Sequence, residues 1–525
     1  MSFTKSDYLR SKLLIGILFV LSALIRGQTV NPDSALQTII GKLEGSPITL
    51  SEAYELAKEN STAIGKVEAL FMAAEGNLKR QRGYFDPEFY FNLYYNDLDI
   101  PTSSFFAGAN VLQTKETTSQ TGLTLKLPIG TQLELGLNTY SLNSNSQFAF
   151  LNPEYNASGS LSFRQPLLEG FIANGRKDLT SAEYEYEGAK ALYDQEIIRI
   201  TSEVEIAYWD LYSAERNYGV QKLVRDRAKE FLLEAQVRRE AGLVGPDQVA
   251  NAKTFLAEQE ILFIDQEEML DNQSDLLAVL IGKRPESSSA RFKTTDTPPS
   301  EFPIEPVDVM IDYAIESNLQ LKAVQDGINA SNALVDAASW QVLPSLNLVG
   351  SISSAGIGGD SQSVIFGSDT LQTTSSGSFG DMLNQVIKRD YPGWSIGVEL
   401  SVPIGFRTDI GEKDRLEALT YRAEQNYTEL SREIEKSVRS AHRELLHGNS
   451  RIKAATDGVE AAQEQVRIGR IGFQNGQLTA FELVRLGEDF AKAQRRYSEA
   501  LVRTVNAVAK LRQLTSGRYP ENLNY

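Results

Sequence analysis

The chain has 525 residues, 23% of them charged, and its mean hydropathy is −0.27, values that exclude a polytopic α-helical membrane protein. It contains no cysteine, which excludes disulfides, thiolate metal sites and a lipid-modified N-terminal cysteine. The net charge of −17 argues against a nucleic-acid partner, because phosphates require basic patches.

The first predicted element in chain order is a short apolar run, Leu13–Ile25, which follows Lys5, Arg10 and Lys12. The run is shorter than the ~20 residues of a membrane-spanning helix, but its length and basic flank are typical of a secretory signal. We therefore predict a signal peptide at residues 1–27, with an N-terminal anchor as the alternative. An exported chain without disulfides must gain its stability from size, burial or oligomerisation.

The segments after the signal occur twice. The stretch from Ala57 has a helical pattern, reaches Pro87 and then alternates between apolar and polar residues. The stretch from Ala314 does the same through Pro344, and the two prolines are as far apart in sequence as the two alanines. Such self-similarity indicates a tandem duplication.

Two further features recur in the same order. A strand-to-long-helix join lies at Pro166 and again at Pro403, and a glycine interrupts a long helical run at Gly242 and again at Gly476. The predicted order is helix, strands, long helix, glycine turn and helix, followed by the same series again. The predicted divisions are a first repeat at 49–283, a proline-rich linker at 284–306, a second repeat at 307–516 and a C-terminal tail at 517–525.

The long helices carry heptad patterns. Apolar or small residues recur at alternating steps of four and three from Ile434 to Val466, resume from Leu486 to Leu514, and occur likewise from Ile197 to Tyr218. This spacing is that of a coiled-coil seam. The seams are narrow and rich in alanine, which favours helices packed side by side in the wall of a cylinder; the core of an ordinary helical bundle is the alternative.

The predicted helix lengths are complementary. At a rise of ~1.5 Å per residue, two of the shorter helices placed end to end match one long helix. The linker would then form a band at mid-height. The expected sets are 175–240 with 247–283 and 308–340, and 411–474 with 481–514 and 49–80.

Two predicted strands, Phe89–Leu98 and Trp394–Val402, are about as long as a tilted membrane-spanning strand, ~9–11 residues. The tract Ser353–Asp381 is rich in glycine and serine and is predicted to be loop. These features favour an outer-membrane barrel, with a soluble β-domain as the alternative. Two short strand pairs cannot close a barrel, and lipid forbids open sheet edges, so membrane placement requires several copies of the chain.

One stretch departs from a plan of two strand pairs. Residues Thr117–Asn143 have the pattern of an additional hairpin that turns at Pro128–Gly130, and the second repeat has no counterpart. The hairpin would form either extra barrel strands or a hairpin outside the membrane, and we favour the second interpretation.

Several motifs in this order resemble those of the TolC family of outer-membrane efflux proteins, also called outer membrane factors. The resemblance extends from about Thr49 to Ser516. It depends on the tandem layout and on four motifs together. These are "QPLLEG" at Gln165–Gly170, "VPIGF" at Val402–Phe406, "AGLVGPDQVANAK" at Ala241–Lys253 and "NGQLTAFELVRLG" at Asn475–Gly487.

The resemblance implies an α+β membrane protein of the cell outer membrane. It implies a homotrimer with a shared twelve-stranded β-barrel, about four strands per chain, that continues into a long α-helical coiled-coil tunnel in the periplasm. Such trimers dock a periplasmic adaptor (membrane fusion) protein and an inner-membrane pump, and carry small molecules or polypeptides out in efflux or type I secretion. The barrel–tunnel junction would then lie at Pro87, Pro166, Pro344 and Pro403.

In this family the glycine turns form the periplasmic tip, where the pore closes. Acidic rings follow the second-repeat glycine, Gly476, by six and nine residues, and this chain has Glu482 and Arg485 there. Three arginines close to three carboxylates would partly neutralise them. We predict a Glu482–Arg485 ring pair at the constriction, with solvated turn charges as the alternative.

The other closing contacts of the family are absent from this chain. Where the family has a tyrosine and an arginine around the second glycine, the chain has Phe473 and Leu478. The first-repeat turn at Gly242 is followed by Asp247 and Gln248. The closed-state contacts of the family therefore do not carry over to this sequence.

The sequence predicts neither an enzyme nor a cofactor or metal site. The two histidines, His442 and His447, are five residues apart and so do not share one helical face. No glycine loop followed by Lys-Ser/Thr is present to bind phosphate. The alternative function is a periplasmic coiled-coil scaffold or adaptor without a pore, which would not explain the strand-to-helix joins.

Overall fold

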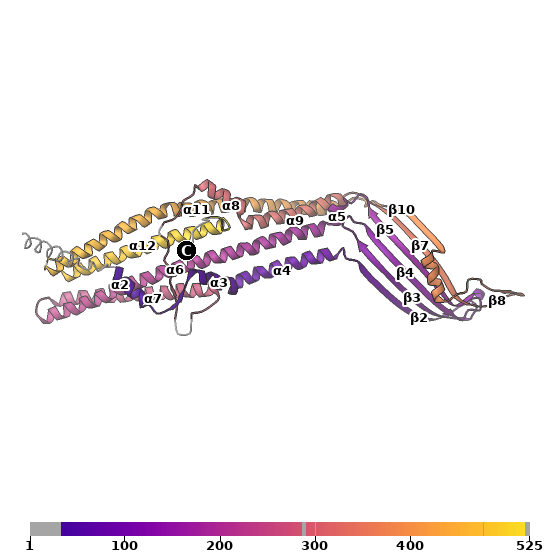
Figure 1. Ribbon diagram of the computed structural model, residues 1–525, viewed down its shortest axis with the longest axis horizontal. Helices are drawn as coiled ribbons and strands as arrows, with labels where there is room; N and C mark the ends of the chain where they lie inside the picture. Colours follow the sequence, from indigo (N-terminus) through magenta and orange to yellow (C-terminus); the bar gives the residue numbers. More distant parts are fainter. Residues whose placement is uncertain (1–32, 286–289, 300, 476, 520–525) are drawn as a thin grey trace, which may run out of the picture. The chain divides into compact units, whose positions relative to one another are not determined.

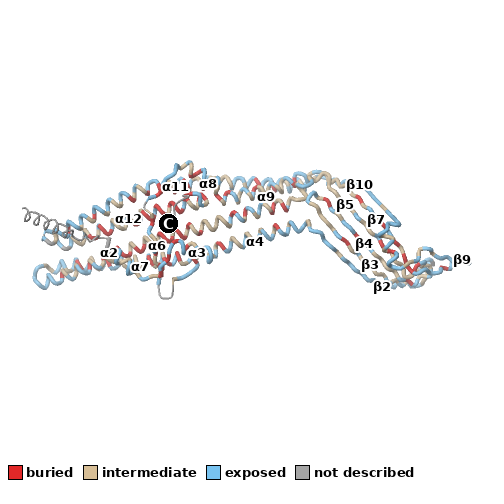
Figure 2. The backbone as a smooth tube through the Cα atoms, in the orientation of Figure 1, coloured by how far each residue is buried: buried red, intermediate tan, exposed pale blue. Residues whose placement is uncertain are grey.

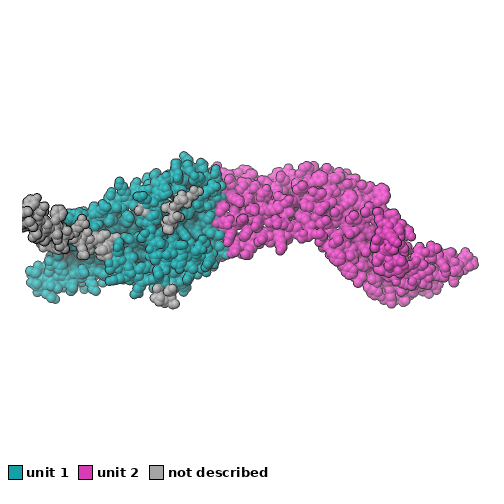
Figure 3. All heavy atoms as spheres, viewed as in Figure 1, with its two compact units in different colours: residues 1–65, 195–318, 433–525 teal, residues 66–194, 319–432 magenta. Residues whose placement is uncertain are grey.

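The computed structural model describes residues 33–285, 290–299, 301–475 and 477–519. The chain divides into two compact units (Figure 3). Unit 1 comprises residues 1–65, 195–318 and 433–525, and unit 2 comprises residues 66–194 and 319–432. The predicted signal peptide at 1–27 and residues 520–525 of the predicted tail lie outside the described residues.

Helices account for most of the described chain (Figure 1). The two long ones, with 64 and 68 residues, end at the positions predicted from the sequence, Glu240 and Gln474. Among the residues that the structure describes, no helix combines the length and apolar content needed to cross a membrane. The helices are α2 (Asp33–Gly41), α3 (Leu50–Asn60), α4 (Thr62–Gly83), α5 (Ile172–Gly175), α6 (Lys177–Glu240), α7 (Pro246–Ile281), α8 (Val307–Ser317), α9 (Leu319–Gln341), α10 (Phe379–Lys388), α11 (Arg407–Gln474) and α12 (Ala480–Leu514).

The strands form one large sheet and two small ones. The large sheet has six strands in the order β10-β7-β5-β4-β3-β2, and every neighbouring pair is antiparallel. Its strands are β2 (Glu88–Pro101), β3 (Val111–Lys126), β4 (Gln132–Ser144), β5 (Leu151–Pro166), β7 (Ser345–Ser361) and β10 (Tyr391–Ser401). The small sheets pair β1 (Ser46–Ile48) with β6 (Phe292–Thr294) and β8 (Val364–Phe366) with β9 (Asp369–Leu371).

The large sheet corrects the expected strand count. We expected about four strands per chain and favoured a separate location for the hairpin within Thr117–Asn143; the sheet has six strands, and this hairpin supplies β3 and β4 between β2 and β5. The hairpin alternates between apolar and polar residues as its neighbours do, so joining the sheet places its leucines on the same face as theirs.

The expected loop at Ser353–Asp381 is only partly a loop. Strand β7 continues to Ser361, and the tract also contains β8, β9 and the start of α10. Small residues such as Gly356 and Gly358 give no visible apolar alternation, which is why the sequence pattern missed this part of the strand.

Two helices that the sequence predicted as continuous are interrupted. The breaks lie at Ser61, between α3 and α4, and at Asn318, between α8 and α9. Both residues have an extended backbone, with φ −67° and ψ 117° at Ser61 and φ −66° and ψ 116° at Asn318. At each break the backbone N–H still donates to the carbonyl four residues earlier, so the chain changes direction without losing that bond.

The breaks are the places where other helices end. A Cβ atom added to Gly282, the C-cap of α7, would lie 2.7 Å from the Cβ of Asn60. The Asn318 side chain donates a hydrogen bond of 3.0 Å to the carbonyl of Leu514, the last residue of α12. The end of α7 therefore lies against the α3–α4 break, and the end of α12 lies against the α8–α9 break. We expected the opposite pairing, with 247–283 meeting 308–340 and 481–514 meeting 49–80.

Many residues of unit 1, apolar ones among them, are buried along its helices (Figure 2). Helix α6 is central to it, with Tyr208, Trp209 and Leu211 all 0% exposed. Ser202 on α6 donates to the Ala509 carbonyl on α12, and Gln221 on α6 bonds to Gln259 on α7. Several members of the predicted heptad seam of α11 are buried, namely Ile434, Val438, Ala441, Leu445, Ile452 and Ala462.

The segments that carry β1 and β6 are attached to α6 by polar contacts. The Glu215 carboxylate accepts from the Thr294 N–H and hydroxyl, both at 2.7 Å, and burial raises its pKa to about 7. The Tyr208 hydroxyl donates to Asp296 Oδ2 at 2.8 Å, and burial raises its pKa. The same Asp296 oxygen accepts from the backbone N–H of Leu50, the first residue of α3, at 2.7 Å.

In unit 2, α6 packs between the helices that lead into the sheet. Leu78 of α4 forms a buried cluster with Leu179 and Ala182 of α6. Gly188 of α6 lies so close to α9 that a Cβ there would be 3.3 Å from the carbonyl oxygen of Ala323. The helices α4 and α9 therefore flank α6 where they approach strands β2 and β7.

Candidate functional site: a two-faced sheet and two helical turns

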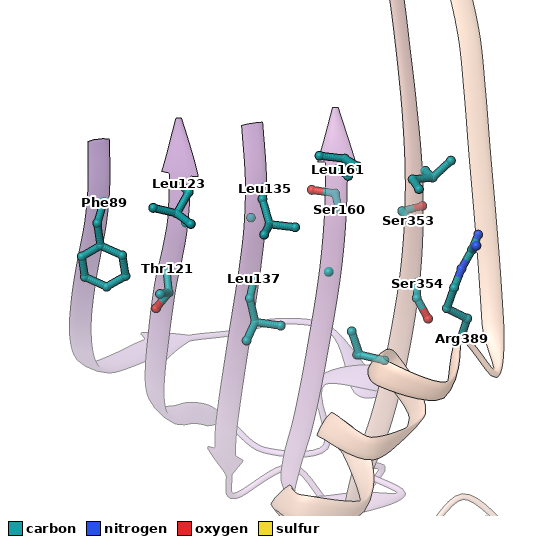
Figure 4. A pocket seen from close by; sticks show the side chains of 15 residues that line it. Phe89, Thr121, Leu123, Leu135, Leu137, Ser160, Leu161, Ser353, Ser354 and Arg389 are labelled. Atoms are coloured by element: carbon teal, nitrogen blue, oxygen red, sulfur yellow. The ribbon is translucent and has the colours of Figure 1, made fainter. Parts of the chain in front are cut away.

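One face of the six-stranded sheet, called the apolar face below, carries an exposed row of apolar residues. Successive strand pairings place one residue from each strand in a single cross-strand row, and every member is apolar. Figure 4 shows Phe89, Leu123, Leu135 and Leu161 of this row on neighbouring strands. The exposed fractions lie between 43% and 77%. The complete row is Phe89, Leu123, Leu135, Leu161, Ile352 and Trp394.

The opposite face of the sheet is polar. Side chains alternate between the two faces along a strand, so the adjacent row points the other way. Every residue in that row is polar, and none is buried. The row is Glu88, Thr124, Glu134, Ser162, Ser351 and Ser395.

Helix α10 covers part of the apolar face. A Cβ at Gly159 would lie 2.8 Å from Val386, and one at Gly356 would lie 2.2 Å from the carbonyl oxygen of Met382, so only glycine permits this approach. Gln385 donates to the Ile357 carbonyl and accepts from its N–H. Between α10 and the strands lies a groove of about 410 Å³ that Arg389 also lines (Figure 4).

The two outermost strands of the sheet, β2 and β10, each present one unpaired edge in the chain. Almost every residue of both strands is exposed, whereas most residues of the central strand β5 are half-buried or buried. Unpaired N–H and C=O groups along an exposed strand are a template for pairing with another strand.

The four prolines predicted to mark the strand–helix junction all lie near strand ends. Pro87 directly precedes β2, Pro344 directly precedes β7, and Pro166 is the last residue of β5. Pro403 lies two residues after the end of β10.

After Pro166 and again after Pro403, the backbone adopts the same unusual geometry. Gly170 and Phe171 have φ values of 76° and 45°, and Gly405 and Phe406 have φ values of 103° and 51°. Phenylalanine rarely adopts a positive φ, and each Gly-Phe pair stands shortly before a helix begins. The motif at Val402–Phe406 contains the second pair, whereas the motif at Gln165–Gly170 ends at the glycine of the first.

The first glycine turn connects α6 to α7. Gly242 has φ 72°, its N–H donates to the Arg239 carbonyl, and the N–H of Leu243 donates to the Arg238 carbonyl, both at 2.9 Å. This is the αL geometry that commonly ends a helix. The predicted tip residues Asp247 and Gln248 are exposed in the first turn of α7.

The second glycine turn connects α11 to α12, and its glycine, Gly476, lies outside the described residues. Leu478, which stands where the family has an arginine, packs over the turn: a Cβ at Gly472 would lie 3.6 Å from its Cβ. Its N–H donates to the Gly472 carbonyl at 3.3 Å. Phe473 is half-buried in the last turn of α11.

Glu482 has a local structural role at the start of α12. It forms a capping box with Thr479: its carboxylate accepts from the Thr479 N–H and hydroxyl at 2.8 Å each, and Thr479 Oγ1 accepts from the Glu482 N–H. These bonds lower the pKa of Glu482, the backbone N–H having the larger effect. Arg485 is exposed one turn further along α12.

The regions near both turns come together in unit 1. The rings of Phe231 on α6 and Phe481 on α12 are 6.1 Å apart. A Cβ at Gly487 on α12 would lie 2.6 Å from the Arg227 guanidinium, and burial lowers the pKa of that arginine. Helices α6 and α12 are therefore in direct contact along the segment of α6 that leads to the first turn and the start of α12.

Comparison with known proteins finds a family match for part of the chain. Residues 310–517 match a family model described as "Outer membrane efflux protein". No curated protein matches the chain.

Solved structures of outer-membrane channels are similar over most of their length. The outer-membrane channel OprN is 15% identical, with a TM-score of 0.62 over 89% of this chain and 90% of that chain. The outer membrane protein VceC of Vibrio cholerae is 16% identical, with a TM-score of 0.61 over 89% and 96%. The CmeC outer membrane channel of Campylobacter jejuni is 14% identical, with a TM-score of 0.60 over 90% and 87%. The resemblance to the TolC family is therefore confirmed: residues 310–517 match the outer membrane efflux protein model, and the chain has the fold of outer-membrane channels.

Proposed function

We propose that this chain is the outer-membrane channel of a tripartite efflux system. It would be a passive exit duct for small molecules or polypeptides from the periplasm and an inner-membrane pump to the outside. The two-faced sheet carries this proposal: its exposed apolar face suits outer-membrane lipid, and its polar face suits a water-filled lumen.

A single chain cannot complete the duct. The sheet has two unpaired edges, and a bilayer core leaves no water to satisfy them. The family resemblance implies a homotrimer. Because all neighbouring strands are antiparallel and their number is even, β2 and β10 run in opposite directions. The β2 edge of one copy can therefore pair with the β10 edge of the next and close a shared barrel.

The helices would continue the barrel as a coiled-coil tunnel in the periplasm. Residues 49–283 and 307–516 would be tandem repeats joined by the linker at 284–306, after a signal peptide at 1–27 and before a tail at 517–525. The glycine turns would form the end that docks a periplasmic adaptor and the pump. This role needs no catalytic residue and no cofactor. A pore-less scaffold is not favoured, because it gives no reason for an exposed apolar sheet face.

The Glu482–Arg485 ring remains part of this proposal. The capping bonds leave Glu482 near the start of α12 with a lowered pKa, so it is negatively charged at neutral pH. Alanine at Glu482 and at Arg485 should change cation preference in opposite directions. Single-channel recordings in which both variants keep the wild-type conductance and selectivity would show that these are only solvated turn charges.

Edge pairing can be tested by cross-linking, since the chain has no native cysteine. Asn92→Cys on β2 is combined in turn with Gly393→Cys, Ser395→Cys or Gly397→Cys on β10. Within one chain these strands are five steps apart, ~24 Å at ~4.8 Å per step, far beyond disulfide reach. We expect covalent trimers in outer membranes from at least one pair.

The control pairs Asn92→Cys with Ser162→Cys on the central strand β5, which should give no covalent oligomer. Planar-bilayer recording of the purified wild type supplies the second readout, discrete channel openings. Failure of every β2–β10 pair to cross-link, together with an absence of channels, would refute the proposed function.

A further inference from the structure

We infer that the β3–β4 hairpin enlarges the shared barrel to eighteen strands, so that the exit through the outer membrane is wider than the twelve-stranded barrel that the family resemblance implies. This inference rests on the proposed trimeric channel. Three copies of a six-stranded sheet give eighteen strands, whereas three copies of four strands give twelve.

The hairpin is a full part of the ladder. Strand β3 pairs with β2 along the whole length of β2, from Glu88 opposite Thr124 to Pro101 opposite Val111. Strand β4 pairs with β3 from Gln132 to Ser144 and with β5 from Gln132 to Leu142. Two strands therefore separate β2 from β5. Removing the hairpin from the sheet would break the β2–β3 and the β4–β5 pairings.

The hairpin also supplies both faces of the barrel wall. Leu123 and Leu135 continue the apolar row, and Thr124 and Glu134 continue the polar row. A hairpin that stood in water would have no need of an apolar face in register with four other strands. The alternation is what a segment between lipid and lumen requires.

Side-chain packing fixes the hairpin to β2 on the polar face. The Tyr90 ring lies over Gly122 of β3, where a Cβ would be 2.5 Å from the ring. The Tyr90 hydroxyl donates to Glu134 of β4 at 3.0 Å. An aromatic ring that covers a strand glycine in this way stabilises the pairing of the strands.

The turn between β3 and β4 is fixed to the end of β5 and to the residues just before α6. A Cβ at Gly175, just before α6, would lie 2.5 Å from the Pro128 carbonyl oxygen and 2.6 Å from the Gly130 nitrogen. The Gln165 side chain donates to the Ile129 carbonyl at 3.3 Å and bonds to Thr131. The turn therefore sits on the strand–helix junction at the end of β5.

The width of the barrel sets the size of the solutes that can leave through it. Barrel diameter grows roughly linearly with strand number, so eighteen strands give a lumen about 1.5 times as wide as twelve. The hairpin lines this lumen with hydroxyl and amide groups, including Thr118, Gln120, Asn138 and Tyr140. The outer exit would therefore admit bulky hydrated solutes and extended polypeptides.

The direct test is cryo-electron microscopy of the wild-type oligomer in lipid nanodiscs. We expect a closed barrel of eighteen strands that includes β3 and β4. A closed barrel of twelve strands with the hairpin outside it would overturn this inference and leave the proposed channel intact. A particle without a closed barrel would overturn both.

A variant measures the effect of the hairpin on pore width. Residues 102–150 are replaced by an Asn-Gly turn, which joins β2 directly to β5 and keeps Phe89 on the same face as Phe163. The matched control deletes residues 363–372, which contain the separate β8–β9 hairpin. The readout is the largest polyethylene glycol that enters the lumen from the outer side.

We expect the excluded polymer diameter to fall by roughly one third in the 102–150 variant, as the linear relation between diameter and strand number requires, and to stay unchanged in the control. An unchanged limit in the 102–150 variant would overturn the inference. If that variant does not assemble, the strand count of the wild-type barrel by cryo-electron microscopy tests the inference alone.

Discussion

The sheet of unit 2 and the helices of unit 1 use apolar side chains in opposite ways. In unit 1, Tyr208, Trp209 and Leu211 are 0% exposed, because α6 is surrounded by other helices of the same chain. In the sheet, Phe89 is 65% exposed and Trp394 is 77% exposed. The middle of α6 is buried within the chain, whereas this row of the sheet is presented to its surroundings. Under the proposed function, the sheet is the part of the molecule that depends on lipid and on other copies of the chain.

A charge on the apolar face should destabilise the sheet more than the same charge on the polar face. Leu135→Arg should destabilise the folded protein in lipid by about 2–4 kcal/mol, the cost of arginine near the bilayer midplane. Urea unfolding in lipid vesicles, followed by tryptophan fluorescence, measures the change. The control is Ser162→Arg on the polar face, which should have little effect. Equal losses in the two variants would contradict the assignment of the faces.

Ionisation of Glu215 tests the buried interior of unit 1. Its pKa is raised from 4.5 to about 7, so the folded state binds the proton more tightly and loses stability as the pH rises through this window. Ionisation at pH 8 should cost on the order of 3 kcal/mol relative to pH 4. Glu215→Gln should remove that slope from denaturant unfolding followed by circular dichroism, whereas Glu258→Gln, on the exposed face of α7, should keep it. If stability still falls with rising pH in Glu215→Gln, the pH dependence belongs to another group.

Close helix packing in unit 1 is tested by two glycines of α11. A Cβ at Gly448 would lie 2.5 Å from the Thr504 hydroxyl oxygen and 3.0 Å from its Cβ, so Gly448→Ala should destabilise by about 1–3 kcal/mol. Nothing lies within 4 Å of a Cβ at Gly458, and Gly458→Ala should stabilise by about 0.5–1 kcal/mol. Thermal unfolding of both variants gives the comparison, and a shift of the same sign in both would contradict the packing of α11 on α12.

The smallest expected effect is at the second turn. Thr479→Ala removes one partner of the capping box and should cost about 1 kcal/mol, confined to the start of α12. Hydrogen exchange should show faster exchange in the first turn of α12 only. The control is Thr456→Ala, where the hydroxyl donates to the Ile452 carbonyl within α11 and is not a cap. Faster exchange throughout α12 would show that the cap supports more than its own turn.

Regular periodicity made much of the fold predictable. The ends of α6 and α11 fell where glycine turns interrupt heptads. The edge strand β2 contains the predicted stretch Phe89–Leu98, and β10 covers Trp394–Val402 except for its last residue. The breaks at Ser61 and Asn318 could not be predicted, because neither residue is a proline or glycine and the contacts at the breaks come from distant helix ends. The position of β3 and β4 depended on which strands they pair with, which alternation within a strand does not specify.

The site was less predictable than the fold. Glu482 was identified from its distance to Gly476, but its capping bonds to Thr479 follow from the Thr-x-x-Glu spacing, a signal that was present and not used. The positive φ values of Phe171 and Phe406 are a property of the three-dimensional join, for which the recurring Gly-Phe pair was the only sequence trace. Helix α10 on the apolar face follows from glycines at facing positions, which local sequence does not connect.

Quenching of fluorescent labels along β4 in lipid vesicles determines whether the two faces of the sheet lie against lipid and against water. Single cysteines at residues 133–138, each carrying a fluorescent label, are exposed in turn to a brominated lipid and to a water-soluble quencher. The two-faced sheet predicts strict alternation, with labels at Leu133, Leu135 and Leu137 quenched from the lipid and those at Glu134, Gly136 and Asn138 quenched from water. Equal access of the aqueous quencher to both sets would contradict a wall between lipid and lumen.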